Sequence, residues 1–432
     1  MGKVAKNATW IIACRIAQAF FALAIYMLTA RFLGPSNFGI IIYASSLVAF
    51  VAPIMNLGFN NILVQDIINN PEREGKTVGT TILLSLISAV FCISGITTFA
   101  YIANQNEFST IIVCFLYSLL LIFQALELIQ YWFQAKYLSK YTSIVTLCAY
   151  LVVSAYKVFL LVTQKSVYWF AISNAFDYCL IGISLIVIYR KLGGQKLEFS
   201  LGLGKELFSR SKHYILSSMM VTIFAQTDKI MIKSMLGETA TGFYGAAVAC
   251  AGLTSFIFTA IIDSFRPSIL EAYEEDTKAF EYRLTLLYSI IIYLSLSQSI
   301  IMTIFARSFI IVLYGPAYEA SIGALQAVVW YTTFSYMGAI RDVWILANNK
   351  QNVLWKINMS GAIANVIINW LLIPRFGIYG ASAASIITQF FTNVVTGFIM
   401  KQIRPNNFLM INGLDPRLII GLLRRMISRE RK

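Results

Sequence analysis

Twelve apolar runs divide this sequence, and each is long enough to cross a lipid bilayer. The hydrocarbon core of a bilayer is about 30 Å thick, which a helix of roughly 20 residues spans. Of the 432 residues, 58% are hydrophobic and only 12% are charged, a balance outside the range of ordinary soluble domains. The sequence therefore predicts an all-α integral membrane protein of twelve transmembrane helices. The runs lie at about residues 8–33, 38–64, 77–103, 108–135, 142–163, 167–190, 211–236, 242–265, 284–306, 320–346, 353–373 and 378–401.

The runs are continuous, without the alternation of apolar and polar residues that the strands of a membrane β-barrel need. The first run is too long and too evenly apolar for a cleavable signal peptide, so we interpret it as a helix. No segment between the runs is long enough to fold into a catalytic domain. The sequence therefore predicts a protein that is not an enzyme.

The net charge of +14 reflects membrane topology rather than nucleic-acid binding. If the helices alternate in direction from a cytoplasmic N-terminus, most Lys and Arg residues fall on the cytoplasmic side, as the positive-inside rule requires. Both termini are then cytoplasmic, and the basic clusters face anionic membrane lipids. These clusters contain Arg190, Lys191, Lys196, Lys205, Arg210 and Lys212 in the central loop, and Arg417, Arg424, Arg425, Arg429, Arg431 and Lys432 in the tail.

A short turn is repeated in the two halves of the chain. The first copy runs from Leu33-Gly34 to Gly39, and the second from Leu236-Gly237 to Gly242. The first Gly of each copy suits a left-handed helix end, and the last suits close helix packing. The repeat predicts two homologous six-helix bundles, an architecture typical of transporters. The predicted parts are an N-terminal bundle 1–195, a cytoplasmic linker 196–210, a C-terminal bundle 211–403 and a basic amphipathic tail 404–432.

Ionisable residues inside a membrane span are costly and mark polar pathways or paired sites. In the first helix, Arg15 and Tyr26 belong to one polar stripe. The guanidinium of Arg15 suits a phosphate group, although this side chain could instead extend to the lipid headgroups. Gln124 and Glu127 share a polar face of the fourth helix.

The fifth and sixth helices contribute Lys157, Asn174 and Asp177. Lys157 and Asp177 could form a structural ion pair. Because Asp177 lies deeper in its span, we favour a shared water-filled cavity.

The second half contributes Gln226, Asp228 and Lys229 in the seventh helix and Arg341 in the tenth. Adjacent helical residues point about 100° apart, so Asp228 and Lys229 need separate partners. Asp228 could be an H⁺ or Na⁺ site, or it could be a structural hydrogen-bond acceptor between the halves.

Four stretches together resemble the bacterial polysaccharide flippases, the O-antigen and capsule repeat-unit transporters related to the MATE exporters. The resemblance covers nearly the whole chain, and the stretches mostly mark helix turns and packing. They are Arg31-Phe-Leu-Gly-Pro-Ser-Asn-Phe-Gly39, Tyr131-Trp-Phe-Gln-Ala-Lys136, Asp228-Lys-Ile-Met-Ile232 with Leu236-Gly237, and Asn365-Val-Ile-Ile-Asn369 with Ile373-Pro-Arg-Phe-Gly-Ile-Tyr-Gly-Ala381.

The resemblance implies two six-helix bundles in a V, alternating access, and a lipid carrier such as undecaprenyl diphosphate bearing an oligosaccharide. It implies a location in the bacterial cytoplasmic membrane, beside the polymerase and glycosyltransferases of a surface-polysaccharide pathway. Of the residues assigned below, only Asp228 and its neighbour Lys229 lie in a matched stretch.

The physical argument assigns diphosphate binding to Arg15, Lys157, Lys229 and Arg341, sugar binding to Tyr26, Gln124, Asn174 and Gln226, and ion coupling or gating to Asp177, Asp228 and Glu127. We expect no cofactor or metal, and coupling to H⁺ or Na⁺ stays open. The alternatives are an ion-coupled multidrug exporter of the same fold, a membrane glycan polymerase or ligase, and a scaffold protein.

Overall fold

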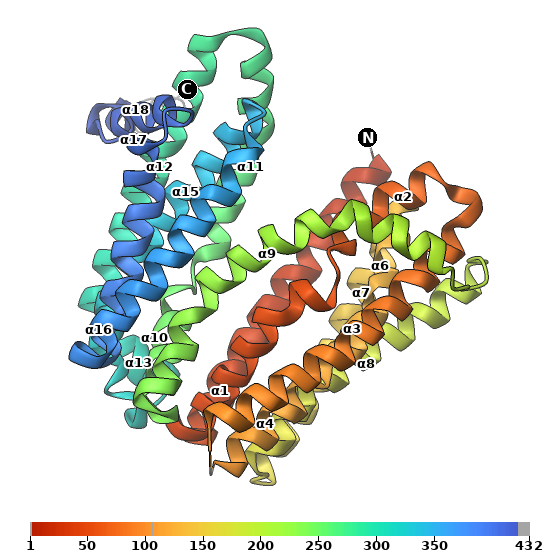
Figure 1. The fold of residues 1–432 in the computed structure, drawn as a ribbon. Coiled ribbons are helices and arrows are strands. Elements are labelled where there is room, and N and C mark those ends of the chain that lie inside the picture. Colours follow the sequence, from red (N-terminus) through yellow and green to blue (C-terminus); the bar gives the residue numbers. More distant parts are fainter. Residues whose placement is uncertain (1, 106, 422–432) are drawn as a thin grey trace. The chain divides into compact units, whose positions relative to one another are not determined.

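The computed structural model describes the backbone of residues 2–105 and 107–421, and the side chains of residue 18 and of residues 21 onward within those ranges. Every regular element in the described part of the chain is a helix (Figure 1). Packing contacts divide the chain into two units, Met1–Gly242 and Phe243–Lys432.

The described part of unit 1 contains nine α-helices with short 3-10 turns between some of them. These are α1 (Gly2–Met55), α2 (Leu63–Asn69), α3 (Glu74–Ala103), α4 (Phe108–Ser118), α5 (Leu120–Leu126), α6 (Gln130–Ala135), α7 (Ser139–Val162), α8 (Val167–Lys191) and α9 (Leu201–Leu236), with η1 (Phe59–Asn61), η2 (Pro71–Arg73) and η3 (Glu127–Ile129). A tenth helix, α10 (Glu238–Ala251), crosses the boundary into unit 2.

Unit 2 continues with α11 (Ser255–Glu275), α12 (Thr277–Ile304), α13 (Ala306–Leu313), α14 (Ser321–Val328), α15 (Trp330–Ala347), α16 (Leu354–Phe390), α17 (Thr396–Ile399) and α18 (Arg404–Asn412), with η4 (Pro316–Tyr318), η5 (Gln351–Val353) and the π-helix η6 (Phe391–Val395).

Helices lie at all twelve predicted spans, although several are joined or broken. In the described residues, eight helices are long and apolar enough to cross a membrane, and the bent pair α10 and α11 makes a ninth. Two of the eight, α1 and α16, each contain two spans that meet at a non-helical glycine, Gly34 or Gly377. The predicted span 320–346 is divided between α14 and α15. The prediction of an all-helical membrane protein is confirmed.

The second span is shorter than the sequence predicts, because its helix ends at Met55 instead of continuing to residue 64. Leu57 and Gly58 both have positive φ angles, 50° and 69°, which no α-helix accommodates. A short 3-10 turn and α2 follow.

Large apolar side chains cover the outside of the helices, as a lipid environment requires. Phe91 and Val162 of unit 1 are 74% and 78% exposed, and Val312 of unit 2 is 70% exposed. In water such surfaces would drive association. Buried apolar clusters fill the interior of each unit.

The two copies of the repeated turn have matching backbones. Gly34 has φ 70° and ψ 171°, and Gly237 has φ 88° and ψ −179°. A side chain would strain either position, so the expected need for glycine at both helix ends is confirmed, although the ψ angles place both residues outside the left-handed helical region.

The last glycine of each copy packs against the other copy, within unit 1. A Cβ atom on Gly39 would collide with the carbonyl oxygen of Glu238, and one on Gly242 would collide with the carbonyl oxygen of Pro35. Pro35 and Glu238 occupy the same place in the two copies, so the contacts are reciprocal. The expected close packing is therefore present.

An ion cluster attaches the start of α9 to the rest of unit 1. The carboxylate of Asp66 is fully buried and accepts hydrogen bonds from Arg210 at 2.7 Å, Arg73 at 3.2 Å and Thr77 at 3.0 Å. Residues 201–210, which the sequence assigns to the cytoplasmic linker, are helical and form the start of α9. The contacts divide the chain after Gly242, and the predicted bundle boundaries stay a prediction.

Candidate functional site

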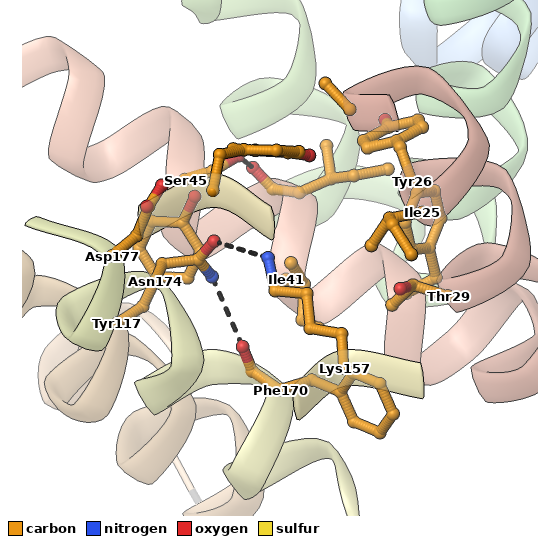
Figure 2. A pocket seen from close by; sticks show the side chains of 14 residues that line it. Ile25, Tyr26, Thr29, Ile41, Ser45, Tyr117, Lys157, Phe170, Asn174 and Asp177 are labelled. Carbon is orange, nitrogen blue, oxygen red and sulfur yellow. Dashed lines mark hydrogen bonds between the residues drawn. The ribbon is translucent and has the colours of Figure 1, made fainter. Parts of the chain in front are cut away.

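Unit 1 contains a cavity of about 240 Å³ between α1, α4, α7 and α8 (Figure 2). One wall is apolar and comes mainly from α1. The polar side chains that line the cavity are Tyr26, Thr29, Ser45, Tyr117, Tyr150, Lys157, Asn174 and Asp177. This mixture of aromatic surface with a few polar groups is typical of small-ligand sites.

The ammonium of Lys157 is held on the cavity wall by the neighbouring helix. Its Nζ donates a hydrogen bond of 3.0 Å to Oδ1 of Asn174. The amide of Asn174 donates to the carbonyl oxygen of Phe170, one turn earlier in α8, at 3.2 Å. Because the amide is fixed through its nitrogen, its oxygen faces Lys157, as Figure 2 shows. The cavity therefore presents a positioned cation.

Asp177 follows Asn174 by three residues in α8, and so lies on the same helical face. Its Oδ1 is buried and has no hydrogen-bond partner among the described residues. Asp177 and Lys157 line the same cavity, but the ammonium is bonded to Asn174, and the described structure shows no ion pair between the two charges. A buried carboxylate oxygen without a partner is costly, so the cavity offers it to a ligand, a cation or water.

Three tyrosines, Tyr26, Tyr117 and Tyr150, give the cavity its aromatic surface together with the rings of Phe38 and Phe170. Tyr26 also packs edge to face against Phe38, with ring centroids 4.9 Å apart. Thr29 adds a second buried oxygen that lacks a hydrogen-bond partner within the described part of the chain. Tyr117 and Tyr150 were not predicted from the sequence, because single tyrosines in apolar runs carry no positional signal.

The predicted residues Gln124 and Glu127 do not line this cavity. Gln124 belongs to α5, and its Oε1 is buried without a partner among the described atoms. Glu127 begins η3 and interacts electrostatically with Asp177. Glu127 therefore lies near the polar side of the cavity, and Gln124 lies three residues earlier in the chain.

The predicted residues of α9 also lie away from the cavity. The Nζ of Lys229 donates a hydrogen bond of 2.9 Å to Oε1 of Gln226, one turn earlier. Asp228 is buried, with 9% of its surface exposed. The side chain of Arg15 lies outside the described residues.

Arg341 lies in α15 of unit 2, where protein groups already surround its guanidinium. It donates to the carbonyl oxygen of Thr392 at 3.1 Å, to Oδ1 of Asn393 at 2.9 Å and to Asp342 at 2.9 Å. Thr392 and Asn393 belong to the π-helix η6, whose wide turn alters the helical hydrogen bonding. A phosphate at Arg341 would have to replace these bonds.

Known proteins match the chain over most of its length. A family model described as polysaccharide biosynthesis protein matches residues 4–272. The capsular polysaccharide biosynthesis protein CapF of Staphylococcus aureus is 20% identical over 406 residues, which is 92% of this chain and 99% of the relative.

Two solved structures show the fold. The lipid II flippase MurJ, in an inward closed conformation, has a TM-score of 0.70 and 13% identity, and the match covers 96% of this chain and 92% of that one. An inward-facing multidrug resistance MATE family transporter of the MOP superfamily has a TM-score of 0.69 and 13% identity, and the match covers 91% and 95%. The expected MATE-like helical fold is confirmed.

Proposed function

Because the chain belongs to the polysaccharide biosynthesis protein family, we propose that it is a flippase that moves a lipid-linked oligosaccharide from the inner to the outer leaflet of a bacterial cytoplasmic membrane. The observation that carries the proposal is the ammonium of Lys157, fixed in a tyrosine-lined cavity within a membrane-spanning unit. A cation at that depth costs free energy, and an anionic cargo offsets this cost.

The cargo has three chemically different parts. An undecaprenyl diphosphate carrier presents phosphate oxygens, a polar glycan and an isoprenoid tail. In this proposal Lys157 binds the diphosphate, and Tyr26 and Asn174 contact the first sugar through ring faces and amide hydrogen bonds. The cavity of about 240 Å³ is smaller than a typical ligand site of about 300–1,000 Å³. It therefore receives the headgroup in part, while the tail stays in lipid.

The remaining sequence assignments enter as proposals for other stages of the cycle. Arg15, Lys229 and Arg341 supply positive charge along the path of the diphosphate, and Gln124 and Gln226 bind sugar hydroxyls. Transport proceeds by alternating access. Protonation or Na⁺ binding at Asp177 or Asp228, with Glu127 nearby, couples it to an ion gradient. A polymerase and glycosyltransferases act on the same lipid-linked intermediate.

A multidrug exporter of the same fold is the second candidate function. The observation in its favour is the buried Oδ1 of Asp177, which would attract a cationic drug. Lys157 in the same cavity opposes such a ligand by charge repulsion. Growth of a deletion strain in cationic dyes distinguishes the two functions, because only an exporter protects the cell.

The direct test is deletion of the gene in its own host. A flippase mutant accumulates lipid-linked oligosaccharide in the cytoplasmic membrane and lacks surface polysaccharide, and a plasmid copy reverses both effects. Lipid extracts and surface glycans are measured in the same cultures. Normal surface polysaccharide in the deletion strain, with no accumulated intermediate, refutes the proposal.

A further inference from the structure

Lys233 forms the centre of an ion cluster that none of the assignments above uses. It lies in the last turn of α9, and only 2% of its side chain is exposed. Its Nζ donates a hydrogen bond of 2.6 Å to Oε2 of Glu107 and lies 3.4 Å from Oε2 of Glu238. Glu107 precedes α4, and Glu238 begins α10. One lysine therefore links three helix ends, and we call these three residues the clamp.

Other polar groups orient the clamp. Thr110 donates a hydrogen bond of 2.8 Å to Oε2 of Glu107. Burial raises the pKa of Glu107, but the hydrogen bonds from Lys233 and Thr110 and the charge of Lys233 outweigh it and hold this pKa below its ordinary value. The carboxylate is therefore charged at neutral pH.

The clamp lies where the two copies of the repeated turn meet. Ser36 of the first copy donates to Oε1 of Glu238 in the second copy, at 3.5 Å. Beside this bond, Gly39 and Gly242 make the reciprocal backbone contacts described above. The charge distribution of the sequence predicts that this end of the helices faces outside.

The chemistry of this junction suits a contact that separates and forms again. The carboxylate-bearing side chains of Glu107 and Glu238 are 43% and 34% exposed, so water can replace Lys233 as their partner. Glycines pack by backbone contact, without interlocked side chains, so their separation exposes little apolar surface. The cluster around Leu121 and Cys92 has a different composition: it is apolar and buried, so its separation would expose apolar surface.

We propose that Lys233, Glu107 and Glu238 form a reversible clamp that holds the two repeated turns together and releases them in each transport cycle. The opening direction, toward the outer side, rests on the proposed function. The buried state of Lys233 favours the closed form, because both carboxylates neutralise its charge there. Release transfers all three groups to water.

The test measures access to the junction without any substrate. In a variant whose native cysteines are replaced, Thr241→Cys places one thiol at a fully buried position inside the second turn. A membrane-impermeant maleimide is added to intact cells. Slow labelling is expected with the clamp intact, and Lys233→Met raises the rate by roughly tenfold or more, since it removes the only buried cation of the clamp. Glu107→Gln raises the rate less, because Glu238 remains.

Cys92, restored alone, is the matched control. It is buried in the apolar cluster, and its labelling stays slow in every clamp variant. An unchanged labelling rate at Thr241→Cys, or an equal rise at Cys92 that reports general loosening, overturns the proposal.

A second experiment connects the clamp to transport. Ser36→Cys with Glu238→Cys places two thiols at the positions joined by a hydrogen bond. Because a cysteine is shorter than a glutamate, a short bifunctional maleimide with a reducible spacer is used to join the two thiols and close the junction. Export of surface polysaccharide stops on cross-linking and returns on reduction of the spacer if the junction must open, and normal export in the cross-linked form overturns the clamp. If the deletion strain has normal surface polysaccharide and no accumulated intermediate, but the labelling pattern is as expected, the proposed function is refuted and the clamp proposal stands.

Discussion

Replacement of Lys157 by Met tests the cavity at its most specific point. Met keeps the length and apolar stem of the side chain but removes the ammonium and its bond to Asn174. A hydrogen bond to a charged partner contributes about 1.5–3 kcal/mol, and each 1.4 kcal/mol changes an equilibrium about tenfold. If the ammonium binds the diphosphate while it crosses the membrane, Lys157→Met lowers the export rate by about 10- to 150-fold.

The effect on folding is expected to be much smaller. The mutation loses the charged hydrogen bond to Asn174, worth about 1.5–3 kcal/mol, but at the same time removes a charge from a poorly hydrated place, and this gain offsets much of the loss. Membrane abundance therefore stays close to that of the unmodified protein. Lys157→Arg keeps the charge and retains part of the activity.

The assay compares surface polysaccharide and accumulated lipid-linked intermediate in a deletion strain that carries each variant at equal abundance. Lys165→Met is the matched control, because Lys165 is an exposed lysine in the turn that follows the same helix. Export by the Lys165→Met variant should be unchanged. Export by Lys157→Met within twofold of the control would refute the assignment of Lys157 to the diphosphate.

Three further predictions follow from contacts in unit 1. Gly242→Ala places a Cβ atom against the carbonyl oxygen of Pro35 and should lower the free energy of unfolding by about 1–3 kcal/mol, seen as a lower melting temperature in detergent. The control Gly95→Ala, whose Cβ atom meets nothing within 4 Å, should leave the melting temperature unchanged. Asp66→Asn weakens a buried ion cluster and should destabilise the protein by up to about 3–5 kcal/mol. Asp263→Asn, which removes a charge from an exposed ion pair, is the control, and equal stability of the two variants would contradict this prediction. Asp177→Asn should make export insensitive to dissipation of the H⁺ and Na⁺ gradients by ionophores, and unchanged ionophore sensitivity would exclude Asp177 as the coupling site.

The sequence predicts helices well because membrane spans carry a strong local signal. The position of each apolar run, and the positive φ angles at Gly34 and Gly237, follow from short stretches alone. The broken helices do not, since the bend between α10 and α11 arises within a continuous apolar run. Local composition therefore locates the spans better than their ends.

The cavity was predicted only in part. Lys157, Asn174 and Asp177 could be found because ionisable and amide groups are rare inside spans. Tyr117 and Tyr150 could not, because a tyrosine in an apolar run serves equally well as core or as lining. The burial of Asp66 depends on Arg210, 144 positions away, and no local pattern reveals such a pairing. Lys233 was missed for the same reason.

The reciprocal contact between the two repeated turns has the symmetry of a dimer interface. In an isologous interface, residue i of one subunit meets residue j of the other, and j meets i in return. Gly39 with Glu238 and Gly242 with Pro35 obey this rule, although they belong to one polypeptide. In such an arrangement one residue type, glycine, satisfies both contacts. A larger residue at either glycine therefore disrupts one contact and leaves its counterpart in place.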